Sequence, residues 1–259
     1  MTQNTTVEVW KKIIIACITA ACALGAMYLG RVFLNTQAFV SDTGGLSAFT
    51  SVYGTLYGIL LAFIIFEVWN QFNKTSELLD QEALGLERLF ALSLDFRDKQ
   101  FAARMKKRIQ AYIQLVTKDF DALGKGQRPK ESSKAFRKIA QQLRKITFDD
   151  DHDQTVFRSI IEQYGRLAEV RAARINQSLA RLPVMLKVFL YLSSFFTVAI
   201  AVLMPFANSY YGVLTVIALV VTMTLALQIV VDLDNPFAGV WVVTPEPFER
   251  TLQHIENDY

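Results

Sequence analysis

The sequence predicts an all-α integral membrane protein with four transmembrane helices and a cytoplasmic helical bundle inserted between helices two and three. Hydrophobic residues make up 52% of the 259 residues and charged residues 20%, which is unusually apolar for a soluble domain. The apolar residues gather in long runs near the two ends of the chain, whereas the middle has an ordinary soluble composition. Lysine and arginine are also distributed unevenly between the connecting segments, as they are in inner-membrane proteins.

The apolar runs predict four membrane spans. Each is close to the twenty residues that a helix needs to cross the hydrocarbon core. An isolated apolar run in lipid must be helical, because only a helix satisfies its backbone polar groups internally. The expected spans are 13–34, 51–69, 187–206 and 211–231.

The basic residues predict the orientation of these spans. Lys11 and Lys12 precede the first span, and residues 67–185 carry 22 lysines and arginines against 16 aspartates and glutamates. Only Arg31 and Asp42 lie around the first loop on the opposite side. We therefore expect a multi-pass protein of the inner membrane with both termini cytoplasmic. The predicted domains are 1–73 (helices one and two), 74–185 (cytoplasmic helical domain), 186–233 (hairpin of helices three and four) and 234–259 (cytoplasmic tail).

The middle of the chain is expected to be a bundle of about four helices. Apolar residues recur at helical spacing along each segment. Gly124, Gly126 and Pro129 break the pattern between the second and third helices, and Pro183 ends the fourth. In the tail, Phe248 and Ile255 lie on one face of a last helix, which we expect to pack on this bundle. The four expected segments are 67–94, 99–123, 132–146 and 154–182.

Two short motifs carry a resemblance to a known family. The run 68–72 (Val-Trp-Asn-Gln-Phe) follows the second span, and 232–237 (Asp-Leu-Asp-Asn-Pro-Phe) follows the fourth, with 244–248 (Thr-Pro-Glu-Pro-Phe) shortly after. Together they resemble the bestrophin-like family of bacterial membrane proteins, long known as a domain of unknown function. That family is distantly similar to bestrophins, which are pentameric anion channels whose second helix lines the pore. The resemblance therefore implies a homo-oligomer that conducts small ions.

The chain also departs from bestrophins at two places. In bestrophins the Asn-Pro-Phe turn precedes acidic residues that bind calcium, whereas here Ala-Gly-Val-Trp follows, which argues against a calcium site of that type. Where bestrophins have a bulky apolar neck, the resemblance places Ser51, Thr55 and Ile59. A similar hydrophobic gate is therefore not expected.

One face of the second span is the candidate pore wall. Its residues follow spacings of four, four, three and four, as one stripe of a helix does. Helix packing is the alternative, because small residues are common where membrane helices touch. Glu67, at the inner end of this span, is either a ring of charge at a pore mouth or a salt-bridge partner of an arginine among residues 171, 174 and 181. The candidate pore-lining residues are Ser51, Thr55, Ile59, Ala62 and Phe66.

The segment after the fourth span is the second candidate site. Asp232 and Asp234 lie at the negative end of a helix, where a carboxylate is unfavourable unless a cation or a basic side chain pairs with it. With Asn235, Pro236 and Phe237 they form either a structural turn tied by arginine or a cation contact.

Other chemistries find little support in the sequence. There are only two histidines and two cysteines, and neither pair has metal-ligand spacing, so no metal or cofactor is expected. No nucleophile has a partnered base, which argues against an enzyme, and the net charge of +3 is too small to indicate a nucleic-acid partner. The expected partners are the lipid bilayer, further copies of the chain and small ions. The two functions left open are an ion channel and a non-conducting membrane sensor or scaffold whose helical domain binds a partner.

Overall fold

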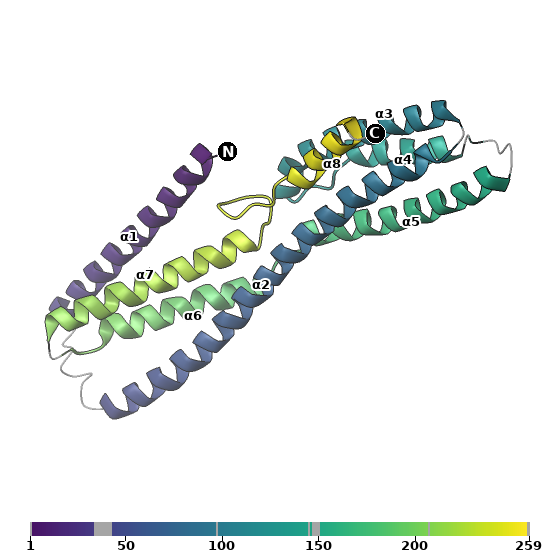
Figure 1. The fold of residues 1–259 in the computed structure, drawn as a ribbon. Helices are drawn as coiled ribbons and strands as arrows, with labels where there is room; N and C mark the ends of the chain where they lie inside the picture. The colour runs from purple at the N-terminus through teal and green to yellow at the C-terminus, as the bar shows by residue number, and fades with distance from the viewer. Residues whose placement is uncertain are drawn as a thin grey trace. The chain divides into compact units, whose positions relative to one another are not determined.

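The structure, a computed structural model, describes residues 2–33, 43–96, 98–144, 146, 151–206 and 208–257. Within these residues all regular structure is helical, which confirms the predicted all-α class. The chain forms two compact units (Figure 1). Unit 1 comprises Met1–Asn70 and Arg181–Asp234, and unit 2 comprises Gln71–Ala180 and Asn235–Tyr259.

Within the described residues, four helices are long and apolar enough to cross a membrane, which agrees with the four predicted apolar segments. Helix α2 is continuous from unit 1 into unit 2, since no proline or glycine pair interrupts it after the apolar stretch. Helix α1 begins well before the predicted span, because the polar residues that precede Lys11 extend the same helix. The four are α1 (Thr2–Phe33), α2 (Thr43–Leu94), α6 (Val184–Leu203) and α7 (Ser209–Leu233).

In unit 1, helices α1, α6 and α7 contact one another. Ala20, Ala23 and Met27 of α1 pack on Val216 and Val220 of α7. The small alanines allow the helix backbones to approach closely, as is usual between membrane helices. Only 17–22% of each apolar window is buried within the chain, so most of its apolar surface is left for contact with lipid or other membrane protein.

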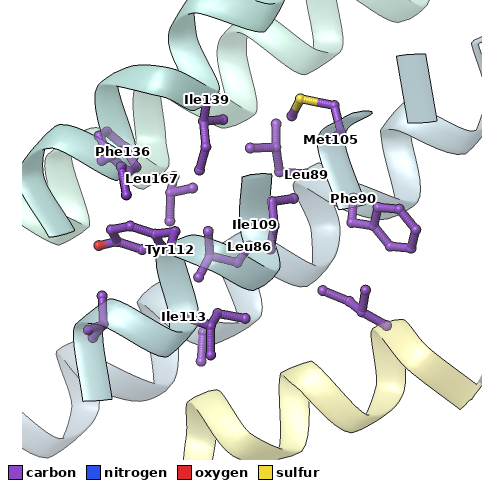
Figure 2. Packing of buried hydrophobic residues seen from close by; sticks show 14 of the residues in the cluster. Leu86, Leu89, Phe90, Met105, Ile109, Tyr112, Ile113, Phe136, Ile139 and Leu167 are labelled. Carbon is purple, nitrogen blue, oxygen red and sulfur yellow. The ribbon is translucent and has the colours of Figure 1, made fainter. Parts of the chain in front are cut away.

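Unit 2 has a core of its own, built by the second half of α2 and four further helices. Figure 2 shows Leu86 and Leu89 of α2 meeting Ile109 of α3 and Ile139 of α4. Each fully buried leucine or isoleucine stabilises the unit by about 1.5–3 kcal/mol. The further helices are α3 (Lys99–Gly124), α4 (Glu131–Leu143), α5 (Asp151–Leu179) and α8 (Glu246–Asn257).

The tail contributes to this core. Phe248 and Ile255 of α8 are fully buried among the residues of α2 and α3, and Thr251 between them is also buried. An apolar face at spacings of three and four residues therefore seats α8 on unit 2.

Local sequence explains where these helices begin and end. The Asp98 side chain accepts a hydrogen bond from the Gln100 backbone N–H at 2.8 Å and caps α3. Gly126, with φ of 72°, lets the chain turn at the end of that helix. Two predicted boundaries were too late, since α4 ends at Leu143 rather than 146 and α5 at Leu179 rather than 182. Pro183, at the N-cap of α6, favours the extended backbone that precedes that helix.

Candidate functional site

The predicted stripe of α2 lies on an exposed face of the chain. Ser51, Thr55, Ile59, Ala62 and Phe66 are all exposed within the single chain, with Ile59 at 52% and Phe66 at 62%. None of the five belongs to the packed core of unit 1.

The opposite face of α2 holds the helix in unit 1. Tyr57, Leu61 and Ile64 are buried, and the Tyr57 hydroxyl hydrogen-bonds the Ser194 hydroxyl of α6. One turn earlier, the Tyr53 hydroxyl donates to the Ser193 carbonyl oxygen at 3.2 Å. Tyr57 and Leu61 each lie two residues, about 200° of rotation, from a stripe position. The rotation of α2 is thus fixed by contacts on one side, which leaves the stripe on the other.

A second set of small residues runs beside the stripe. Gly54 and Gly58 precede Ala62 at spacings of four residues, and an added Cβ at either glycine would meet nothing within 4 Å. Sequence reasoning noted the stripe but missed these glycines, although their four-residue spacing was a readable signal. The surface is therefore both exposed and flat enough for close approach of another helix.

Glu67 lies beside the stripe rather than on it. It is exposed and one residue, about 100° of rotation, from Phe66. Two of the arginines expected near it have partners elsewhere in unit 2. Arg174 pairs with Glu82, and Arg171 donates to the Ser133 hydroxyl at 2.8 Å.

The two aspartates after the fourth apolar stretch are paired with lysines. Asp232 forms an ion pair with Lys12 of α1. Asp234 accepts from the Lys187 ammonium and from the Leu182 backbone N–H, both at 2.6 Å. These contacts join the ends of α1, α6 and α7 within unit 1. The basic partners in these pairs are lysines, and the Asp234 carboxylate also acts electrostatically on Arg181.

The turn that follows belongs to unit 2. The Asn235 side-chain amide donates to the Gly124 carbonyl oxygen at 2.9 Å, and the Phe237 ring meets the Phe120 ring edge-on with centroids 5.0 Å apart. The Pro236 carbonyl accepts from the Val243 backbone N–H at 2.8 Å. The turn therefore fastens the start of the tail to the end of α3.

A buried charged cluster in unit 2 was not predicted. Arg174 and Glu82 are both fully buried, and the guanidinium Nε lies 2.5 Å from a carboxylate oxygen. The Tyr112 hydroxyl donates to the other oxygen of Glu82 and accepts from Arg171 Nε at 3.0 Å. The available signal was a glutamate on the apolar face of α2, between Leu79 and Leu86, because a buried carboxylate needs a cationic partner.

The pKa values in this cluster follow from burial and charge. Burial and the Glu82 carboxylate raise the pKa of Tyr112 far above its usual range, so it remains a neutral hydrogen-bond donor. Burial alone would lower the pKa of Arg174, but the charge of Glu82 raises it above its ordinary value. Arg174 therefore stays a buried cation that Glu82 neutralises.

Among the described residues, no group of three metal-ligating side chains comes together. His254 lies 3.4 Å from Glu87, and Cys17 and Cys22 are free thiols on α1. The sequence also has an acidic stretch at 149–153, and its first two residues, Asp149 and Asp150, lie outside the described residues.

The apolar helices and the separately packed helical unit define a helical membrane protein. A family model described as the Bestrophin-like domain matches residues 17–248. The chain therefore belongs to the bestrophin-like family, as the resemblance of its motifs indicated. No curated protein sequence matches it.

Solved structures share the fold. Two point mutants of a bacterial bestrophin homologue from Klebsiella pneumoniae superpose with TM-scores of 0.76 and 0.73, at 12% and 13% identity. The alignments cover 95% of this chain and 100% and 99% of those chains. A point mutant described as a membrane protein gives a TM-score of 0.72 at 14% identity, covering 95% of this chain and 99% of that one. At such low identity, these likenesses establish the fold alone.

Proposed function

We propose that the chain is one subunit of a homo-oligomeric channel of the bacterial inner membrane, in which small ions pass along the stripe Ser51, Thr55, Ile59, Ala62 and Phe66. One observation carries the proposal. Helix α2 packs on its own chain through the face of Tyr57 and leaves the stripe exposed. Membership of the bestrophin-like family favours conduction over catalysis.

A conduit along this stripe would need an oligomer. One helix face cannot enclose a conduit, so several copies must present the stripe to a common axis. Gly54, Gly58 and Ala62 would let neighbouring copies approach α2 closely beside the stripe. The resemblance to bestrophins points to five copies.

The proposal places unit 2 and both termini in the cytoplasm. The support is the excess of lysine and arginine in residues 67–185. A topology reporter fused after residue 259, or inserted at Gly126, should report a cytoplasmic location, and one at Gly44 a periplasmic location. A periplasmic signal at Gly126 would overturn this arrangement.

The decisive experiment measures ion flux in liposomes that hold the purified protein. Ile59→Trp should reduce the flux by narrowing the passage. Val188→Trp on α6 is a matched control, since Val188 and Ile59 are both 52% exposed in the chain. The control should conduct like the wild type, because Val188 is not on α2.

Cysteine labelling tests the same surface independently. In a background that lacks Cys17 and Cys22, cysteines at Ser51, Thr55 and Ile59 should react with a water-soluble thiol reagent, because the reactive thiolate forms only in water. Cysteines at Tyr57 and Leu61 should react far more slowly, since both positions are buried.

A non-conducting sensor or scaffold is the second candidate. The observation that favours it is the apolar character of the stripe after Thr55. The Thr55 hydroxyl already donates a hydrogen bond to the Ser51 carbonyl oxygen at 2.8 Å. The next three residues of the stripe, Ile59, Ala62 and Phe66, are apolar. In that case the stripe packs between copies and unit 2 binds a partner. An intact oligomer with no flux and uniformly protected cysteines would establish this alternative over the channel.

A further inference from the structure

Unit 1 carries a long apolar groove that is lined by α1, α6 and α7 and has a volume of about 870 Å³. Its wall extends from Ile18 to Phe33 on α1 and from Tyr191 to Leu203 on α6, which corresponds to about 22 Å and about 18 Å of helix. Both lengths exceed one leaflet of the hydrocarbon core, about 15 Å, or half of its full thickness. The groove is therefore long enough for an extended acyl chain.

The groove narrows toward one end and widens toward the other. A Cβ added at Gly30 of α1 would meet the Leu203 side chain of α6 at 3.8 Å, so the two helices come close at this end. Figure 1 shows α1 running apart from α6 toward the N-terminus. The wide end therefore lies at Ile18 and Tyr191.

The polar groups along the groove already have partners. The hydroxyl groups of Thr19 and Thr224 bond to each other at 3.1 Å, and the Ser194 hydroxyl bonds to that of Tyr57. No charged side chain lines the groove among the residues that the structure describes. An apolar ligand therefore leaves no hydrogen bond unmade, whereas a polar one would lose its own partners in water.

The position of the groove favours lipid over a second copy of the chain. None of the described residues of α2 lines it, and in Figure 1 α6 and α7 run between α1 and the membrane half of α2. In the proposed channel the stripe of α2 faces the common axis, so the groove lies on the outer side of unit 1. This step rests on the proposed function.

We propose that the groove is a binding site for one acyl chain of a phospholipid, with the headgroup at the wide end. Lys187 lies one helical turn before Tyr191 on α6, and both line a smaller pocket that shares Leu227 with the groove. The Lys187 ammonium bonds to Asp234 and is partly exposed. Because an ammonium has three N–H donors, it can also donate to a lipid phosphate.

Native mass spectrometry of the purified full chain tests the site, with phosphatidylglycerol added to protein in lipid-free detergent. We expect the wild type to retain one lipid per chain. Ala26→Trp should lose the lipid-bound peak, because Ala26 lines the groove and an indole would occupy it. Ala21→Trp is the matched control, since Ala21 is also exposed on α1 but does not line the groove. This control should retain the lipid.

Equal retention of lipid in the two tryptophan variants would overturn the proposal. If Ala26→Trp is not recovered folded, Ala199→Leu narrows the groove from α6, and unchanged retention in that variant overturns it equally. An oligomer that dissociates in Ala26→Trp while lipid retention stays the same would make the groove an interface between copies instead. Retention does not need conduction, so a chain that binds the lipid at this site but passes no ions would contradict the channel and support the lipid site.

Discussion

The two halves of α2 have very different surroundings. Its membrane half packs on its own chain along one face, through residues such as Tyr57 and Leu61, and exposes the rest. Its second half is buried in unit 2 along Leu79, Leu86 and Leu89, and even its charged Glu82 is fully buried. A single chain therefore leaves much of the first half of α2 exposed but buries the apolar face of its second half.

This difference shows what stabilises each unit. Unit 2 follows the rules of a soluble domain, in which apolar burial and a paired buried charge act together. Unit 1 can leave apolar side chains exposed because in a membrane they contact lipid rather than water. The loss of stability on substitution should therefore be largest inside unit 2, smaller at the charged ends of the unit 1 helices, and smallest between the membrane helices.

The largest effect is expected from Arg174→Ala. Removing the guanidinium leaves Glu82 as a buried, unpaired carboxylate, which should cost about 3–5 kcal/mol of the free energy of unfolding. Arg166→Ala is the matched control on the same helix, since its ion pair with Glu162 is exposed and should contribute at most about 1 kcal/mol. Denaturant unfolding of purified protein measures both. Equal losses would mean that water reaches Glu82 and that the core of unit 2 is not closed.

The next largest effect is expected from Asp234→Ala. The change removes two hydrogen bonds, from the Lys187 ammonium and from the buried Leu182 N–H. Losing hydrogen bonds to a charged group should lower the free energy of unfolding by about 1.5–3 kcal/mol. Asp80→Ala is the control, because its 3.5 Å contact with Arg250 lies on the surface. A melting temperature lowered equally in both variants would show that Asp234 is merely solvated.

Much of this fold could be predicted from the sequence, because its signals are local. Twenty-residue apolar runs and helical periodicity are properties of neighbouring residues, and they located the apolar helices and the start of α3 at Lys99. The exact ends of α4 and α5 were missed, since helix ends depend on capping contacts that periodicity does not contain.

The candidate sites were less predictable, because their partners are distant in the chain. Glu82 and Arg174 are 92 residues apart, and no rule of spacing joins them. The stripe on α2 could be read from its spacing, but its exposure depends on which face Ser194 of α6 engages. The lysine partners of Asp232 and Asp234 were likewise decided by the packing of α1 and α6, which spacing in the sequence does not contain.

A smaller, pH-dependent effect is expected at Asp119. Because burial raises its pKa in the folded protein, the folded state holds the proton more tightly than the unfolded chain. The resulting stabilisation is present at low pH and is lost as pH rises through the folded pKa. Asp119→Asn cannot ionise, so its advantage in melting temperature over the wild type should be small at pH 4 and larger at pH 7. A difference that does not change with pH would show that Asp119 is solvated rather than buried.

The smallest effect is expected from Tyr57→Phe, which removes the hydroxyl that joins α2 to Ser194 of α6. Hydrogen bonds between membrane helices average about 0.6 kcal/mol, because the separated helices also find polar partners. Tyr210→Phe is the control, since Tyr210 is 86% exposed. Thermal unfolding in detergent should show a small loss for Tyr57→Phe and none for Tyr210→Phe. The labelling of a cysteine at Thr55 should not change in Tyr57→Phe, because the buried face of α2 retains its apolar contacts. Increased labelling of a cysteine at the buried position Leu61 in this variant would instead mean that the single hydroxyl sets the rotation of α2. The membrane half would then be held far less firmly than the half in unit 2.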